Sequence, residues 1–183
     1  MKATGIVRRI DDLGRVVIPK EIRRTMRIRE GDPLEIYTDR EGEVIFKKYS
    51  PIGELTEFAA QYAETLHKTC NLSVVICDRD AVIASAGVPK KEFFDKALSA
   101  ELENILNSRS LYVKSDDSEE YPIIEENRSH HISCAMPILT EGDLIGCVAS
   151  VCLNGSAKSE MKPELEAKLI QTAAIFLGKQ LES

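Results

Sequence analysis

Four arginines near the start of the chain, Arg8, Arg15, Arg23 and Arg24, are the residues best suited to bind an external partner. They lie in and just before the stretch DDLGRVVIPKEIRR, which covers residues 11–24. The planar guanidinium group of arginine donates paired hydrogen bonds to phosphate oxygens and to guanine edges. Contacts to phosphate supply affinity for nucleic acid, and contacts to bases supply sequence preference. This group of arginines therefore favours a nucleic-acid-binding surface.

Charge is distributed unevenly along the 183 residues. Residues 1–50 carry 12 Lys and Arg against 9 Asp and Glu, whereas residues 51–183 carry 12 against 21. A basic end on an acidic protein indicates different partners for the two parts. The residues leave a structural alternative open, in which the arginines form surface ion pairs that contribute little to stability. The available acids are Asp11, Asp12, Glu21 and Glu30.

Short strands and one helix are expected to position the arginines. Alternation predicts the strands, the Asp-Asp-Leu-Gly sequence predicts a turn, and Pro19 can open a helix because its missing N–H is not needed there. The predicted elements are strands 4–10 and 15–18, a helix 20–27, and a hairpin of strands 34–38 and 43–48.

A module of this size is expected to need a second copy of itself. About 50 residues bury too little surface to be stable alone, and two hairpins leave unpaired strand edges. The sequence therefore predicts an obligate dimer in which two chains complete one barrel, with exchanged strands as one solution.

A domain boundary is predicted at Ser50–Pro51, because the residue before proline disfavours helical geometry and the hydrophobic period then changes. The predicted domains are 1–50 and 51–183. In the second, alternating helices and strands predict an α+β fold with an antiparallel sheet. Its expected elements are helix 52–70, strands 72–77 and 81–86, helix 89–107, strand 111–114, a long loop 115–130, a hairpin of 131–139 and 143–152, and helix 163–181.

The last helix carries two apolar stripes, so one can cover the sheet while the other needs a partner, which is either the first helix of this domain or its counterpart in another chain. One stripe is Met161, Leu165, Leu169, Thr172 and Phe176, and the other is Ile170, Ala174, Leu177 and Leu181.

Cysteine and histidine patterns predict neither a disulfide framework nor a metal site. The five cysteines form no Cys-x-x-Cys pair, and their odd number in apolar surroundings indicates reduced core thiols. His67, His130, His131 and Cys134 lack the spacing of paired metal ligands.

No stretch approaches the roughly 20 apolar residues of a membrane helix, and the N-terminus lacks the apolar region of a signal peptide. These observations predict a cytoplasmic protein that does not use a membrane.

The first 50 residues resemble the N-terminal domain of AbrB-type transition-state regulators. The elements T-G-I-V-R, L-G-R-V-V-I-P and E-I-R-R-T occur in the order and at the spacing of that family. The resemblance implies a swapped-hairpin barrel dimer that binds double-stranded DNA. It also implies that the family's DNA-contacting arginines fall on Arg8, Arg15, Arg23 and Arg24. Lys2 and Arg9 are expected as auxiliary phosphate contacts, with no motif to support them.

Residues 52–183 resemble a GAF domain through the order of elements and the hairpin EGDLIGCVAS. GAF domains are commonly small-molecule sensors, although no residue here identifies a ligand and a pocket filled by its own side chains is an equal expectation. With both parts together, the chain resembles two-domain regulators of late, forespore-specific sporulation genes, which act at the nucleoid as activators or repressors. That resemblance implies a tetramer of two barrel dimers joined through the GAF helices.

Two other functions stay open. The barrel family includes antitoxins, which normally bind their toxin through a disordered tail, whereas this chain continues as a folded domain. Certain GAF domains reduce free methionine sulfoxide through cysteines, and the residues to consider are Cys77, Cys134, Cys147 and Cys152. Because these thiols lie in apolar strands with few cations nearby, core packing is expected and no catalytic residue is predicted.

Overall fold

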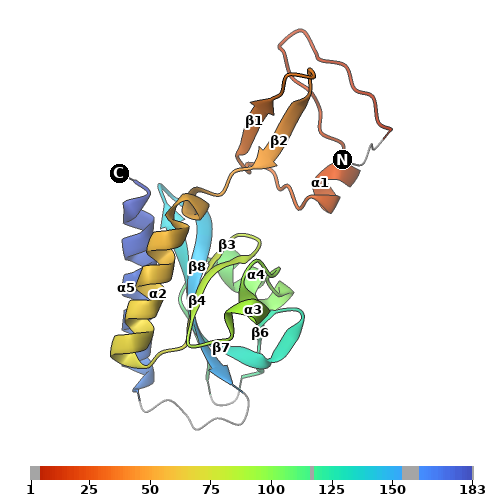
Figure 1. Ribbon diagram of the computed structural model, residues 1–183. Helices are drawn as coiled ribbons and strands as arrows, with labels where there is room; N and C mark the ends of the chain where they lie inside the picture. Colours follow the sequence, from red (N-terminus) through yellow and green to blue (C-terminus); the bar gives the residue numbers. More distant parts are fainter. Residues whose placement is uncertain (1–4, 116–117, 154–160, 183) are drawn as a thin grey trace. The chain divides into compact units, whose positions relative to one another are not determined.

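A computed structural model describes residues 5–115, 118–153 and 161–182 (Figure 1). In it the chain separates into two units, Met1–Tyr49 and Ser50–Ser183. Each unit is described by itself below.

The first unit contains the predicted hairpin and the predicted helix. Strands β1 (Leu34–Thr38) and β2 (Val44–Lys48) pair antiparallel, with Ile36 opposite Phe46. Helix α1 (Lys20–Thr25) follows Pro19, which occupies the N-cap position, and it ends two residues before the predicted Arg27. The hairpin prediction is confirmed, and the helix is shorter than expected.

The two strands predicted before the helix do not form within the single chain. Described residues 5–10 and 15–18 have no strand assignment, and apart from the half-buried Ile18 their apolar side chains are exposed, with Val7 at 89% and Val17 at 70%. A strand needs a hydrogen-bonded neighbour, and in this chain the hairpin pairs only with itself. The prediction of these strands is therefore wrong for one chain taken alone.

The second unit is built on an antiparallel sheet of six strands in the order β4-β3-β8-β7-β5, with β6 paired to β7. Long strands β7 and β8 form the predicted hairpin in the middle of the sheet. The strands are β3 (Val74–Asp78), β4 (Val82–Ala86), β5 (Tyr112–Val113), β6 (Pro122–Ile124), β7 (Asn127–Thr140) and β8 (Asp143–Leu153).

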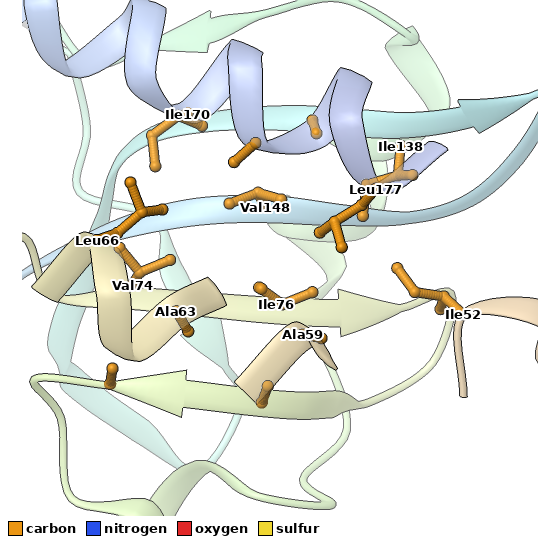
Figure 2. Close-up of a cluster of buried hydrophobic side chains, with 14 of the residues drawn as sticks. Ile52, Ala59, Ala63, Leu66, Val74, Ile76, Ile138, Val148, Ile170 and Leu177 are labelled. Atoms are coloured by element: carbon orange, nitrogen blue, oxygen red, sulfur yellow. The ribbon is translucent and has the colours of Figure 1, made fainter. Parts of the chain in front are cut away.

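Helices cover both faces of this sheet. The 3-10 helix η1 (Pro51–Leu55), helix α2 (Thr56–Cys70) and helix α5 (Pro163–Gln180) enclose one hydrophobic cluster, which includes Ile52, Ile76, Val148, Ile170 and Leu177 (Figure 2). Side chains on the alternate positions of β3 and β8 face a second cluster under helices α3 (Lys90–Phe93) and α4 (Ala100–Ser108). The α+β architecture with an antiparallel sheet is confirmed.

One predicted helix, 89–107, is wrong because the chain breaks it into α3 and α4. Between them Asp95 has a left-handed backbone (φ 60°), and the segment pairs with the edge of the sheet through Asp95 N to Val82 O and Val82 N to Lys96 O. Ser99 then caps α4 by accepting a hydrogen bond from Leu102 N. Edge pairing of this segment outweighed its helical periodicity.

The predicted loop 115–130 is also partly wrong, since it contains β6 and the first residues of β7. Its apolar centre is buried, and Ile132 N donates to Tyr121 O. Among the helices of the described ranges, none has the length and apolar character needed to cross a membrane.

Candidate nucleic-acid interface

The predicted arginines all lie at exposed positions of the first unit. Arg8 and Arg9 precede the Asp11 turn, Arg15 follows it, and Arg23 with Arg24 occupies the last turn of α1. Lys2, expected as an auxiliary contact, falls outside the described residues. The structure therefore places the four main arginines on two segments, an extended arm and a short helix.

Asp11 organises the turn that carries Arg15. Its Oδ1 accepts hydrogen bonds from Leu13 N (3.0 Å) and Arg15 N (2.7 Å), while Gly14 takes a left-handed conformation (φ +75°) that glycine tolerates. Its Oδ2 accepts from Arg15 Nε at 2.8 Å. The Arg15 backbone N–H and guanidinium group together lower the pKa of the Asp11 carboxyl. Asp11 thus holds both the backbone and the side chain of Arg15.

The end of α1 is fixed by backbone hydrogen bonds and by the hairpin. Ile28 N donates to Arg23 O at 2.7 Å across Arg27, which adopts a left-handed backbone (φ 52°). Lys48 Nζ on β2 donates to Arg27 O at 2.9 Å. These contacts set the orientation of the helix turn that carries Arg23 and Arg24 relative to β2.

The first unit has no hydrophobic core of its own. Among residues 5–49, all of them described, Pro19 is the one buried residue. Large apolar side chains are instead exposed along the arm, the helix and both hairpin strands. They are Ile6, Val7, Ile10, Leu13, Val16, Val17, Met26, Ile36, Tyr37, Val44, Phe46 and Tyr49. Exposed apolar surface of this extent is typical of an interaction surface.

An aromatic cluster joins α2 and α5 in the second unit. The Phe176 ring lies 5.9 Å from that of Phe58 and 5.6 Å from that of Tyr62, between ring centroids. Elsewhere on α5, Leu165 and Ile175 are each about half exposed, at 52% and 49%. The stripe through Ile170 and Leu177 is the one buried against the sheet. The other stripe meets the first helix of this unit through Phe176, which contacts Phe58 and Tyr62.

Three cysteines of the second unit, Cys77, Cys134 and Cys147, are buried in its core. Cys77 and Cys147 are opposite each other on β3 and β8 and are fully buried. A hydrogen bond with Cys147, together with burial, raises the pKa of Cys77. Burial and the nearby Glu166 raise the pKa of Cys134 to about 12. Thiols in this state stay protonated at neutral pH and react slowly.

The three histidines, which are possible metal ligands by residue type, make other contacts in the structure. His67 Nδ1 lies 3.0 Å from Leu72 O at the end of α2, and the His130 ring packs edge-on against Phe93. His131 Nε2 lies 3.6 Å from Glu120 Oε1, whose carboxyl pKa is lowered by Lys114 and by His131. Within the described ranges, no three His, Cys, Asp or Glu side chains are grouped so that they could hold a metal ion.

A buried polar contact between α5 and the sheet escaped the sequence analysis. Glu166 is only 6% exposed and accepts a 2.5 Å hydrogen bond from Ser150 Oγ, which in turn accepts from Cys134 N at 3.1 Å. Glu166 lies four residues before Ile170, so extending the sheet-facing stripe by one turn would have predicted its position.

Two family models match the chain. Residues 54–182 match the model described as "Stage V sporulation protein T C-terminal, transcription factor". Residues 7–53 match the model described as "Antidote-toxin recognition MazE, bacterial antitoxin".

Curated relatives cover the whole chain and its first part. The chain is 50% identical to stage V sporulation protein T of Bacillus subtilis (strain 168) over 182 residues, which is 100% of this chain and 99% of that protein. It is 65% identical to the transition state regulatory protein AbrB of the same organism over 51 residues, which is 28% of this chain and 52% of that protein.

Among solved structures, the second unit is similar to a GAF domain/HD domain protein from Geobacter sulfurreducens. That match has a TM-score of 0.50 at 16% identity and covers 74% of this chain and 99% of the other. At this identity the likeness concerns the fold, which is that of a GAF domain.

Proposed function

Because the chain belongs to the stage V sporulation protein T family of transcription factors, we propose that it binds double-stranded DNA through the arginines of its first unit. Membership confirms the resemblance to AbrB-type and GAF-containing sporulation regulators, and it places the protein among regulators rather than enzymes. The proposed division of labour gives DNA binding to residues 1–50 and assembly to residues 51–183.

The observation that carries the proposal is the exposure of the four arginines in the segment most similar to AbrB. Arg8, Arg15, Arg23 and Arg24 are exposed, and Arg15 keeps 69% of its side chain accessible despite its contact with Asp11. Arg9 is exposed beside Arg8 and serves as an auxiliary phosphate contact. Guanidinium groups in such positions can reach phosphates and guanine edges of a duplex.

We propose a barrel dimer as the DNA-binding form. The support is the lack of a core among residues 5–49 together with the exposed apolar side chains of the arm and hairpin. In a second copy these residues would find both strand partners and apolar cover. Two-fold symmetry would then present each arginine twice to the duplex.

Two such dimers are proposed to join through α2 and α5 into a tetramer, since Leu165, Ile175 and Phe176 leave apolar surface exposed on α5. The opposite sheet face is filled by the second hydrophobic cluster, which includes Phe93, Leu102 and Ile123. The exposed apolar side chains of α5 thus support an assembly role for this unit.

By its similarity over the full length to stage V sporulation protein T, the chain is proposed to regulate late, forespore-specific sporulation genes at the nucleoid in the cytoplasm. Activation and repression are both compatible with this proposal.

Binding of duplex DNA across a salt series tests the proposal. Four arginines in each of two chains would neutralise about 8 phosphates, so log K should fall against log salt with a slope of about −7. Replacing Arg23 and Arg24 by alanine removes about half of these contacts and should bring the slope to about −3.5. A slope near zero for the natural protein would contradict DNA binding.

An antitoxin is the second candidate, because residues 7–53 match the MazE model. An antitoxin would neutralise a co-expressed toxin, whereas a developmental regulator would bind many promoters without one. Restored growth of a toxin-expressing strain would favour the antitoxin, and its absence together with salt-dependent DNA binding would favour the regulator.

A further inference from the structure

The Asp11 carboxylate uses its two oxygens for two different tasks. Oδ1 holds the backbone of the turn, through Leu13 N and Arg15 N, while Oδ2 accepts from the Arg15 side chain at Nε. The first contact shapes the loop, and the second restricts the guanidinium group. The two effects can therefore be separated by changing one oxygen.

The chain contains a second loop of the same geometry that lacks the side-chain contact. Asp39 Oδ1 accepts from Glu41 N and from Glu43 N, each at 2.9 Å, and Gly42 has φ +85° where Gly14 has φ +75°. The residue in the place of Arg15 is Glu43, which has no donor for the second oxygen. The turn forms equally in both loops, so the bond to Arg15 Nε is additional to what the backbone needs.

Holding Nε has a consequence for recognition. The guanidinium group has five N–H donors, and with Nε occupied the two terminal amino groups remain as a fork of fixed direction. A fork of fixed direction can make both hydrogen bonds only with a pair of acceptors presented along that direction, and when that pair is a guanine edge the contact depends on the base sequence, which a phosphate contact does not. The carboxylate also offsets the charge of Arg15, which weakens attraction to DNA of any sequence.

We propose that Asp11 is a positioning residue that sets the sequence specificity of DNA binding through Arg15. This inference rests on the proposed function, and it adds that an acidic residue on the binding surface improves discrimination at the expense of affinity for arbitrary DNA.

The substitution Asp11→Asn tests this directly, because asparagine keeps one oxygen to accept from the backbone but offers Nε no second acceptor. A duplex selected from a random pool by the natural protein and a shuffled version of it serve as probes. We expect the ratio of the two dissociation constants to fall about three- to tenfold, with tighter binding to the shuffled duplex and an unchanged unfolding temperature. Asp39→Asn is the matched control and should leave the ratio unchanged.

Two further variants test whether Asp11 changes the ratio of dissociation constants through Arg15. In an Arg15→Ala background, Asp11→Asn should change the ratio no further, whereas a persisting fall would mean that Asp11 acts without Arg15 and would overturn the inference. Arg15→Lys removes the fork while leaving Asp11 intact, so it should lower the ratio even if Asp11→Asn were to unfold. An unchanged ratio in Arg15→Lys, or in a folded Asp11→Asn variant, overturns the inference while DNA binding stands. Absence of DNA binding by the natural protein at low salt would overturn the proposed function as well.

Discussion

Gly146 on β8 is the position where one added methyl group should disturb the second unit most. A Cβ atom at this residue would lie 2.1 Å from Cys77 O, 3.1 Å from Cys77 C and 3.2 Å from Asp78 Cα. All three are backbone atoms of β3, so no side-chain rotation can relieve the overlap. The two strands would have to separate where Asp78 pairs with Gly146. We expect Gly146→Ala to lower the free energy of unfolding by about 2 to 3 kcal/mol.

Urea and thermal unfolding of the full chain, followed by circular dichroism, measure this effect. For a unit of this size the expected loss corresponds to a fall in Tm of roughly 6 to 15 °C. Gly142→Ala is the control, because no atom lies within 4 Å of the Cβ position there and only the left-handed backbone (φ +89°) opposes the change. That strain should cost about 1 kcal/mol. If Gly146→Ala destabilises the protein no more than Gly142→Ala, the steric reasoning is wrong.

Three further predictions concern thiol reactivity and assembly. At pH 8 iodoacetamide should modify the partly exposed Cys70 and Cys152, while Cys134, with a pKa of about 12, should react only after unfolding or as the pH approaches that value; peptide mass spectrometry would reveal early labelling of Cys134 as a contradiction. Deletion of residues 51–183 should weaken DNA binding at least tenfold through loss of avidity, as measured by gel shift, and equal affinity would remove the case for a tetramer. Ile175→Glu, at a half-exposed position of α5, should convert tetramers to dimers in light scattering while the Tm stays within a few degrees, and an unchanged mass would place the interface elsewhere.

Much of the second unit was predictable from local pattern. The β7–β8 hairpin follows from two apolar runs on either side of a Thr-Glu-Gly turn, and helix α5 follows from its helical periodicity. The segment 94–98 did not follow its pattern, because its backbone pairs with the edge of β4. This pairing depends on how the segment folds back onto β4, and the helical periodicity within the segment carries no information about that contact.

The candidate site was also predictable only in part from the sequence. The type and order of Arg8, Arg15, Arg23 and Arg24 are properties of the sequence, and they were sufficient to indicate a surface for phosphate and guanine edges. For Asp11 the sequence predicted a turn and a possible ion pair. The structure alone showed that one carboxylate oxygen accepts from the backbone of the loop and the other from the Arg15 side chain.

The sequence by itself determined the two-part organisation of charge, the arginine-bearing motif, the hairpins and the stripes of α5, because these depend on residue type and short-range period. Tertiary structure alone decided that the arm of the first unit lacks a strand partner in one chain, that Glu166 is buried against Ser150, and that Gly146 must have no side chain. Those features arise where segments far apart in the sequence meet, and the free energy of such contacts depends on distances that no local pattern specifies.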